Sequence, residues 1–212
     1  MFYEVAKRTI DVVGALLLLI IFSPLIIITS ISILVTSPGP LFADTPKRVG
    51  KNGKPFHPYK FRSMIVNAHN LLREDPKFKK LFQEYKKSSY KLHRDPRITV
   101  VGKYIRKHSI DEVPQLINVL RGEMSIVGPR PYYPDELKEQ TKKYPQTKRL
   151  LKDVLSVKPG ITGYWQVTGR SEVNFDKRIE MDAYYARKKS LLFDFLILLK
   201  TPWIMISGKG AI

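Results

Sequence analysis

A long apolar run near the N-terminus is the strongest pattern in the sequence. Val12 to Val35 is mostly Leu, Ile and Val and contains no charged residue. The run matches the roughly 20 apolar residues that a membrane-spanning helix needs. Ser23 and Pro24 interrupt its middle, where proline removes a helical hydrogen bond and clashes with the preceding turn. The sequence therefore predicts a sharp bend between two apolar half-helices, Val12 to Phe22 and Leu25 to Val35.

Two membrane arrangements remain open for this bent segment. Neither half reaches across a hydrocarbon core of roughly 30 Å by itself. Positive charge lies on both sides of the run, whereas a spanning helix favours a strong asymmetry, and this favours a re-entrant hairpin with both ends cytoplasmic. A kinked spanning helix also fits, provided that Ser23 or a neighbouring helix satisfies the carbonyl that proline frees. A cleaved signal peptide is a weaker interpretation, because no small-residue cleavage site stands out before Pro38.

Two further segments combine helical periodicity with interfacial character. Asp75-Pro76 is typical of a helix cap followed by proline in the first turn, and apolar residues then recur at helical spacing among lysines. We expect an amphipathic helix over about residues 71–91, either on a membrane surface or against the domain core. Residues 191–206 are apolar but too short to span, which predicts an interfacial or core helix.

The net charge limits the classes of partner. The 212 residues include 37 Lys and Arg against 19 Asp and Glu, a formal charge of +18. Such a surface attracts nucleic acid, phospholipid headgroups or phosphorylated substrates. The absence of cysteine excludes a disulfide framework, a thiolate nucleophile and a cysteine-ligated zinc site. The length suits one catalytic domain with appendages.

An adjacent pair of carboxylates, Asp111 and Glu112, opens a predicted helix. Apolar residues follow at helical spacing, and Pro114 is tolerated only in the first turn, where its missing N–H is not needed. The positive end of the helix dipole then favours ionised acids and anionic ligands. Because neighbouring helical residues point about 100° apart, the two acids suit separate roles, attack and metal binding. The alternative is a capping box formed by Ser109 and Glu112.

Two segments rich in glycine and proline supply candidate ligand contacts. In Gly128-Pro129-Arg130-Pro131, two prolines brace one arginine in a rigid turn suited to clamping a phosphate or a planar base. A tight connector with a solvated arginine is the alternative. Residues 158–170 carry glycines between large side chains and predict a hairpin or loop whose backbone a ligand approaches closely.

These motifs, in this order and spacing, closely resemble those of the bacterial sugar transferase family, also called monotopic phosphoglycosyl transferases. The resemblance covers nearly the whole chain, and the combination is far more specific than any single motif. The motifs are Ser23-Pro24 in the apolar run, Lys60-Phe61-Arg62-Ser63-Met64, Asp95-Pro96-Arg97-Ile98-Thr99, Ser109-Ile110-Asp111-Glu112-Val113-Pro114-Gln115-Leu116, Gly128-Pro129-Arg130-Pro131 and Pro159-Gly160-Ile161-Thr162-Gly163.

The resemblance implies a two-step reaction with roles for individual residues. Asp111 would attack the sugar-linked phosphate of a UDP-sugar and release UMP, and undecaprenyl phosphate would then accept the phosphosugar. Glu112 would hold Mg²⁺. A carboxylate that attacks a diphosphate needs such a metal and nearby cations to offset the repulsion between negative charges. The implied substrate-binding residues are Lys60, Arg106, Arg130, Gln166, Arg170 and Asp182.

The expected architecture is α+β and mostly helical. Residues 1–40 are predicted to form a re-entrant membrane hairpin, and residues 41–212 a compact cytoplasmic catalytic domain with interfacial helices and a small β element. The resemblance implies a place on the bacterial inner membrane, with the active site on its cytoplasmic face, and a first membrane step of surface glycan synthesis. Anionic phospholipid is an expected partner and nucleic acid is not. The resemblance is compatible with a homodimer but does not fix the oligomeric state.

Larger relatives carry additional spanning helices before the catalytic region, so we expect this chain to be a minimal form. The competing hypothesis is a membrane-anchored anion-binding module without catalysis, motivated by the +18 charge and by the basic residues 45–73. It leaves the paired acids Asp111 and Glu112 and the braced Arg130 unexplained. A non-catalytic assembly partner that retains the fold is a third hypothesis. The sequence does not fix the sugar, the prenyl length or the pathway.

Overall fold

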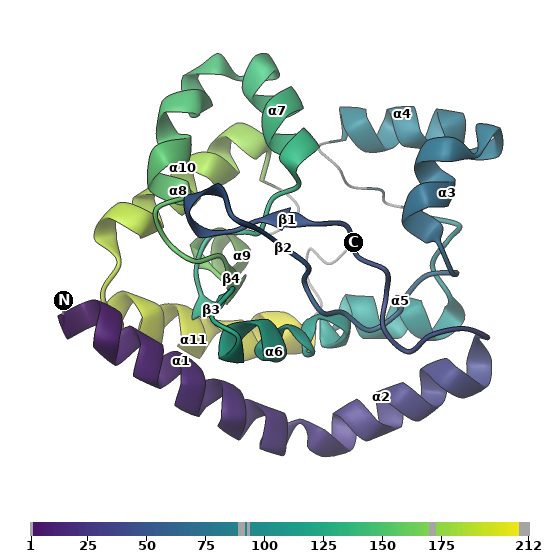
Figure 1. Ribbon diagram of the computed structural model, residues 1–212, viewed down its shortest axis with the longest axis horizontal. Helices are drawn as coiled ribbons and strands as arrows, with labels where there is room; N and C mark the ends of the chain where they lie inside the picture. The colour runs from purple at the N-terminus through teal and green to yellow at the C-terminus, as the bar shows by residue number, and fades with distance from the viewer. Residues whose placement is uncertain (1, 89–91, 93, 170–172, 208–212) are drawn as a thin grey trace.

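The computed structural model is mostly helical, and its strands form two short pairs among the residues it describes, 2–88, 92, 94–169 and 173–207 (Figure 1). This confirms the predicted α+β class. The elements are α1 (Phe2–Ile21), α2 (Ser23–Thr36), β1 (Arg48–Val49), β2 (Pro55–Phe56), α3 (Ala68–Glu74), α4 (Lys79–Lys87), α5 (Val100–Lys107), α6 (Gln115–Leu120), β3 (Ser125–Val127), α7 (Pro134–Lys143), α8 (Leu151–Val154), β4 (Gly160–Thr162), α9 (Tyr164–Thr168), α10 (Phe175–Lys188) and α11 (Leu191–Ser207).

The apolar N-terminal run forms α1 and α2, which meet at a bend of 60°. Pro24 lies in the first turn of α2, where its missing N–H leaves the carbonyl of Ile20 without its usual helical donor. The hydroxyl of Ser23 donates to that carbonyl at 2.7 Å. The predicted break is therefore confirmed, and Ser23 satisfies the backbone group that proline exposes. Helix α1 begins at Phe2, well before the expected start at Val12.

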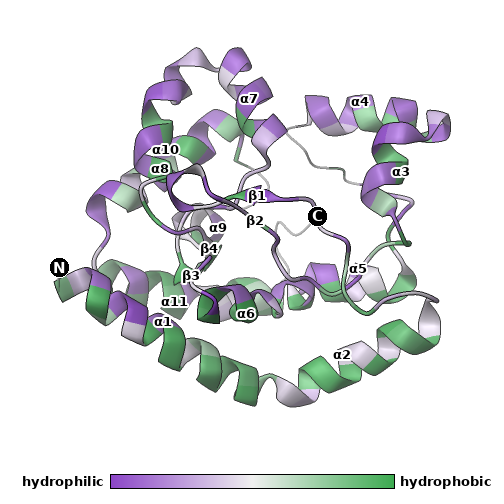
Figure 2. Ribbon diagram, viewed as in Figure 1, coloured by the Kyte–Doolittle hydropathy of each residue, from purple (hydrophilic) through white to green (hydrophobic). Residues whose placement is uncertain are grey.

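By length and composition, the only described helices that could cross a membrane are α1 and α2, and they meet the requirement only as a bent pair. Figure 2 shows hydrophobic residues along α1, α2 and α11 on one side of the molecule. An exposed apolar surface of this extent is typical of a contact with lipid or with another protein. Its large exposed side chains include Leu17, Ile20, Ile28, Val35, Leu199 and Trp203.

Polar contacts fix α1 to the rest of the chain. Asp11 is only 2% exposed, and its carboxylate accepts hydrogen bonds from the Ser125 hydroxyl at 3.0 Å and from the Ile126 N–H at 2.9 Å. One turn earlier, the Arg8 guanidinium donates to the carbonyls of Val119 and Leu120 at the end of α6. Because helix ends leave carbonyls unpaired, Arg8 acts as their cap. Charged side chains of α1, Asp11 and Arg8 among them, thus attach the apolar helix.

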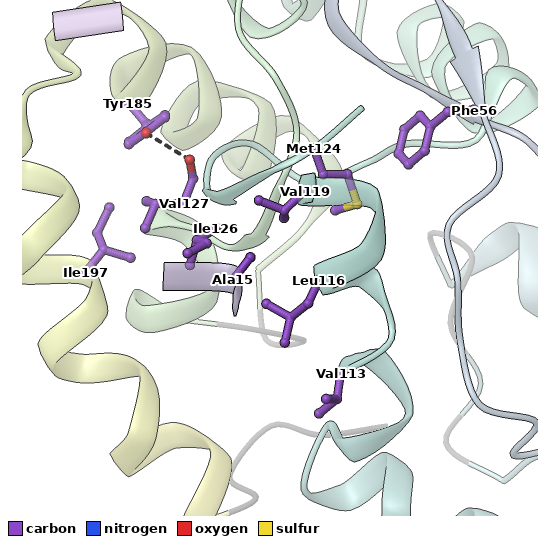
Figure 3. Packing of buried hydrophobic residues seen from close by; sticks show 10 residues of the cluster. All are labelled: Ala15, Phe56, Val113, Leu116, Val119, Met124, Ile126, Val127, Tyr185 and Ile197. Atoms are coloured by element: carbon purple, nitrogen blue, oxygen red, sulfur yellow. Dashed lines mark hydrogen bonds between the residues drawn. The ribbon is translucent and has the colours of Figure 1, made fainter. Parts of the chain in front are cut away.

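A small parallel sheet lies in the main hydrophobic cluster. Strand β3 pairs with β4, and side chains from α1, α6, α10 and α11 pack around it (Figure 3). The Tyr185 hydroxyl donates to the Val127 carbonyl at 3.1 Å and to Asp194 at 2.6 Å. Ala15 of α1 is fully buried in the same cluster. This core fixes the position of the two chain segments that directly follow β3 and β4.

Three local predictions need correction. The expected helix over residues 71–91 is divided into α3 and α4, and residues 89–91 lie outside the described part of the chain. Asp75 does accept a hydrogen bond from the Lys77 N–H, but it caps only a short 3₁₀ turn between the two helices. Residues 158–169 form no hairpin, because β4 pairs in parallel with β3 and leads into α9, and residue 170 lies outside the described part of the chain.

The glycines of this region serve a close approach of two backbones. A side-chain carbon on Gly128 would lie 2.4 Å from the Lys158 carbonyl oxygen, and one on Gly160 would lie 2.1 Å from the Gly128 nitrogen. Gly163 meets the Gly128 carbonyl in the same way, at 2.2 Å. Only glycine permits these distances. The glycines thus let the two motifs pack against each other, and the approach of a ligand to this backbone stays a prediction.

Asp11→Ala should lower the free energy of unfolding by about 1–3 kcal/mol, because it leaves the buried Ile126 N–H without its acceptor and removes one of the two acceptors of the Ser125 hydroxyl. Asp11→Asn keeps one oxygen acceptor and should cost less. Thermal unfolding of the detergent-solubilised protein measures both variants. An Ala variant as stable as the parent would show that this contact does not anchor α1.

Candidate active site

One cavity of about 350 Å³ collects the predicted chemistry. Side chains reach it from the segment before α3, from the end of α5, from the turn before α6 and from α9. Asp182 is fully buried behind Arg130 and does not line the cavity. Arg170 lies outside the described residues. The predicted site residues that line the cavity are Lys60, Arg106, Asp111, Glu112, Arg130 and Gln166.

The paired acids lie on a 3₁₀ turn, Ile110–Glu112, that precedes α6. Ser109 adopts a left-handed backbone conformation with φ of 57°, and its side chain does not cap the turn, so the capping-box alternative is wrong. Asp111 is 7% exposed, and its carbonyl accepts a hydrogen bond from the Phe61 N–H at 3.0 Å. This backbone bond joins the turn to the segment that carries Lys60.

Lys60 and Glu112 form the central ion pair, with 2.5 Å between Nζ and Oε1. Asn118 of α6, which is fully buried, forms hydrogen bonds with the backbone just before Lys60. The Asn118 side chain accepts a hydrogen bond from the Tyr59 N–H and donates one to the His57 carbonyl, both at 2.8 Å. Sequence reasoning missed Asn118, because the helical pattern of α6 marked only its apolar residues.

The two neighbouring acids have opposite pKa shifts. Burial is the largest influence on Asp111 and raises its pKa above the ordinary value; Lys60 opposes this and Glu112 adds to it. Burial acts on Glu112 in the same direction, but Lys60 and more distant arginines outweigh it and lower its pKa. The two carboxylates in the cavity therefore differ in basicity. The ion pair with Lys60 stabilises the charged form of Glu112, whereas the charged form of Asp111 is less stabilised, so Asp111 is the more basic group. A basic carboxylate beside cations is suited to nucleophilic attack.

Arg130 lines the cavity, and buried residues support its backbone. Its backbone N–H donates to Asp182 at 3.1 Å, and the Tyr132 hydroxyl donates to the same carboxylate oxygen at 2.8 Å. The Arg130 guanidinium lies 5.4 Å from the centre of the Trp165 ring, and its buried Nε has no hydrogen-bond partner in the described structure. A rigid arginine with spare donors is suited to binding a phosphate.

Two further groups in the cavity were not predicted. The Arg48 guanidinium stacks on the Tyr133 ring at 3.2 Å from its centre, and both side chains line the cavity. Arg178, which is fully buried and does not line the cavity, supports its wall, with its guanidinium 5.3 Å from the Trp165 ring centre. Arg48 lies in a basic stretch, and no sequence pattern distinguishes it from its neighbours. Tyr133 lies just after the Arg130 turn, so that motif could have indicated it.

Comparison with known proteins identifies the family of this chain. The model of the family described as bacterial sugar transferase matches residues 2–208. The chain belongs to the bacterial sugar transferase family. Its relatives include an undecaprenyl-phosphate galactose phosphotransferase of Salmonella typhimurium, 43% identical over 97% of this chain and 41% of the relative. The UDP-glucose:undecaprenyl-phosphate glucose-1-phosphate transferase of Escherichia coli is 37% identical over 97% of the chain and 41% of the relative.

The transferase thus spans about two fifths of the length of these two relatives. A relative of similar length is the exopolysaccharide production protein ExoY of Sinorhizobium fredii, which is 41% identical over 98% of this chain and 88% of its own. The names of these three relatives describe undecaprenyl-phosphate sugar phosphotransferases and exopolysaccharide production in those organisms.

One arginine in each of two sequence motifs of the transferase supports the structure around the cavity. In the second motif, Arg62 is 4% exposed and donates to the carbonyls of Ser37 and Pro38, which ties the end of α2 beside the cavity. In the third, Arg97 pairs with Asp95 and donates to the Ala68 carbonyl at 2.6 Å. Both arginines line the cavity, but their donors are directed to backbone and to Asp95.

The donor set fits a metal only in part. Within the described ranges, no three His, Cys, Asp or Glu side chains lie close enough to hold a metal ion by themselves. Mg²⁺ is commonly bound by one or two carboxylates, with substrate phosphates and water completing its shell. Asp111 and Glu112 match that mode, and Lys60 would have to share Glu112 with the ion.

Asp182→Asn should flatten the pH dependence of stability between about pH 5 and pH 8. Burial raises the pKa of Asp182 to about 7 from 3.8, although Tyr132 and the Arg130 N–H partly offset it. The folded protein therefore keeps a proton that the unfolded chain has lost, and this stabilising contribution, complete below about pH 4, is lost as pH rises through about 7. Asn does not titrate, so its stability relative to the parent should rise across this range in thermal unfolding.

Asp176→Asn is the matched control for this prediction, because Asp176 lies on the same helix, α10, outside the buried network. Its stability relative to the parent should change far less with pH. A difference between Asp182→Asn and the parent that stays constant from pH 5 to pH 8 would contradict the assigned pKa.

Proposed function

We propose that this bacterial sugar transferase moves a hexose-1-phosphate from a UDP-sugar to undecaprenyl phosphate, giving a polyprenyl diphosphate sugar and UMP. The observation that carries the proposal is the buried Asp111, held in one cavity with Lys60, Arg106 and Arg130. Relatives named for galactose and glucose transfer to undecaprenyl phosphate support the substrate class. Because those names differ in the sugar, the proposal extends to UDP-hexoses as a class.

The reaction proceeds in two displacements at phosphorus. A carboxylate oxygen of Asp111 attacks the sugar-linked phosphate, and the bond to the bridging oxygen breaks, so UMP leaves with that oxygen. The phosphosugar is then bound to Asp111 as an acyl phosphate. A phosphate oxygen of the lipid acceptor attacks the same phosphorus, the bond to Asp111 breaks, and the carboxylate is regenerated. The raised pKa of Asp111 makes its carboxylate a stronger nucleophile in the first step.

Cations around the cavity offset the charge of the reacting phosphates. The Asp182 carboxylate fixes the backbone of Arg130, and the Arg130 guanidinium lies 5.4 Å from the Trp165 ring centre, so the arginine is positioned before a phosphate binds. Lys60 is drawn to Glu112, which keeps its ammonium group beside Asp111. Arg106 and Gln166 complete the polar wall, and the Gln166 Oε1 has no partner among the described residues. Fixed donors of this kind stabilise charge that develops on a leaving phosphate.

Magnesium is part of the proposal. Glu112, with Asp111 beside it, would hold the ion, which supplies charge neutralisation to the diphosphate when bound. Glu112 is suited to this role because its pKa is lowered and its carboxylate therefore stays ionised.

The membrane placement is likewise proposed. With α1 and α2 as a re-entrant pair, the break at Ser23 and Pro24 lies deepest in the bilayer, and both ends return to the cytoplasmic face. The Ser23 hydroxyl bond to Ile20 supports burial in hydrocarbon, where an unpaired carbonyl is costly. The exposed faces of α5 and α11 then rest at the interface. The product is the lipid-linked sugar on which surface glycans such as exopolysaccharide are built.

Enzyme incubated with a UDP-hexose and Mg²⁺, without lipid acceptor, should accumulate a phosphosugar on Asp111 and release an equivalent of UMP. Intact-mass spectrometry detects the adduct, and peptide mapping locates it. Normal turnover without any adduct would indicate direct transfer in place of the two-step route.

Variants separate the two acids in that experiment. Asp111→Asn removes the nucleophile and should abolish both the adduct and turnover. Glu112→Gln retains the nucleophile, so it should form the adduct slowly and respond far less to added Mg²⁺. Parental rates in either variant would overturn the roles proposed for these residues.

Single cysteines at Tyr3 and Lys51 should be labelled from the same side of the membrane, because a re-entrant pair returns both positions to the cytoplasm. The natural chain lacks cysteine, so a membrane-impermeant maleimide reports only the introduced thiols. Labelling from opposite sides would establish a kinked spanning helix instead.

A further inference from the structure

The mouth of the active-site cavity is apolar, although its interior is charged. Of the residues that line the cavity, those with exposed side chains mark where it opens. Four of them are hydrophobic, and Phe42, Ile65 and Val66 are 43%, 40% and 41% exposed. The exposed lining residues are Pro40, Phe42, Ile65 and Val66, with Asp44 and Asn67 as the polar members. Asp111, by contrast, is 7% exposed.

This apolar mouth continues from the end of α2. The helix ends at Thr36, and Arg62 ties the next residues to the cavity segment through the Ser37 and Pro38 carbonyls. The backbone at Gly39 packs against Val66, since a side-chain carbon there would lie 2.6 Å from the Val66 Cγ2. The exposed apolar side of α2 therefore ends beside the mouth of the cavity.

Helix α5 extends the same surface on the other side. The Ile65 N–H bonds to the Arg97 carbonyl, and Thr99, which caps α5, bonds through its N–H to the Ser63 carbonyl. The next residue, Val100, is 86% exposed. Apolar side chains from α2, from the mouth and from α5 thus surround the cavity opening.

We infer that this mouth, formed by Pro40, Phe42, Ile65 and Val66, binds the first isoprenoid units of the lipid acceptor while its phosphate reaches Asp111. The inference rests on the proposed function and adds the residues that receive the hydrocarbon chain. A polyprenyl phosphate carries an anionic head on a long apolar chain, and the cavity presents cations inside and hydrocarbon outside in the matching order. A nucleotide sugar has no comparable apolar part, so the mouth serves the second displacement only.

The experiment measures the two displacements separately on the full chain in lipid nanodiscs. Val66→Ser and Phe42→Ser should form the Asp111 adduct from UDP-hexose at the parental rate. The KM for undecaprenyl phosphate should rise about 5-fold to 20-fold, because a partly exposed apolar side chain no longer contacts the prenyl chain. Their preference for undecaprenyl phosphate over a short-chain prenyl phosphate should shrink. Phe42→Leu should restore much of the acceptor affinity.

Phe195→Ser is the matched control, since Phe195 is 55% exposed on α11 and does not line the cavity. It should leave the acceptor KM unchanged. Phe42 stacks on Phe61, so Val66→Ser is the decisive variant if Phe42→Ser fails to fold.

The outcomes distinguish this inference from the proposed function. A parent enzyme that forms neither adduct nor lipid product refutes both. Parental turnover together with an unchanged acceptor KM in Val66→Ser, or an equal rise in Phe195→Ser, refutes the inference alone. A loss of membrane binding in the mouth variants with normal acceptor kinetics would assign these residues to bulk lipid instead.

Discussion

The attachment of an apolar helix pair to a charged catalytic core is the constraint on which the structure depends. Helices α1 and α2 expose hydrocarbon over much of their length, so packing alone offers little to fix their position if lipid surrounds them. Asp11, Arg8 and Arg62 supply the directional contacts instead. Each charged group finds its partners in backbone or hydroxyl groups of the core, which avoids unpaired buried polar atoms. The cavity therefore keeps a defined position relative to the bend.

The catalytic cavity is built by segments that are distant in sequence. Phe61 bonds to the carbonyl of Asp111, Asn118 holds the chain before Lys60, and Asp182 of α10 holds the backbone of Arg130. Glycines let the Arg130 turn pack directly on the chain around β4. Many residues of the sequence motifs thus support and position a few reactive side chains.

Charge within the cavity is divided between binding and mounting. The net charge of +18 favours anionic partners in general, yet Arg62 and Arg97 direct their donors to backbone or to Asp95. Lys60, Arg106 and Arg130 remain facing the space beside Asp111. The ion pair of Lys60 with Glu112 also separates the two neighbouring acids electrostatically, because it favours the charge of Glu112 and leaves Asp111 more basic. Local arrangement, and not total charge, decides the chemistry.

The sequence by itself determined the break at Ser23 and Pro24, the α+β class and the residues that gather in the cavity. Proline chemistry is local, and the motifs carried the family resemblance. It could not determine that Asp111 lies on a 3₁₀ turn, or that Gly128 and Gly160 serve each other.

Tertiary structure alone decided how the site is supported. Asn118 and Arg48 act through contacts with segments far along the chain, and Asp182, which the resemblance named, supports the backbone of Arg130 and does not line the cavity. Periodicity reports which face of a helix is apolar, but it does not report which distant carbonyl a buried amide will meet. The apolar mouth of the cavity likewise exists only where the chain after α2 packs against Ile65 and Val66. Local patterns thus fixed the elements and the reactive groups, and long-range packing fixed their support and access.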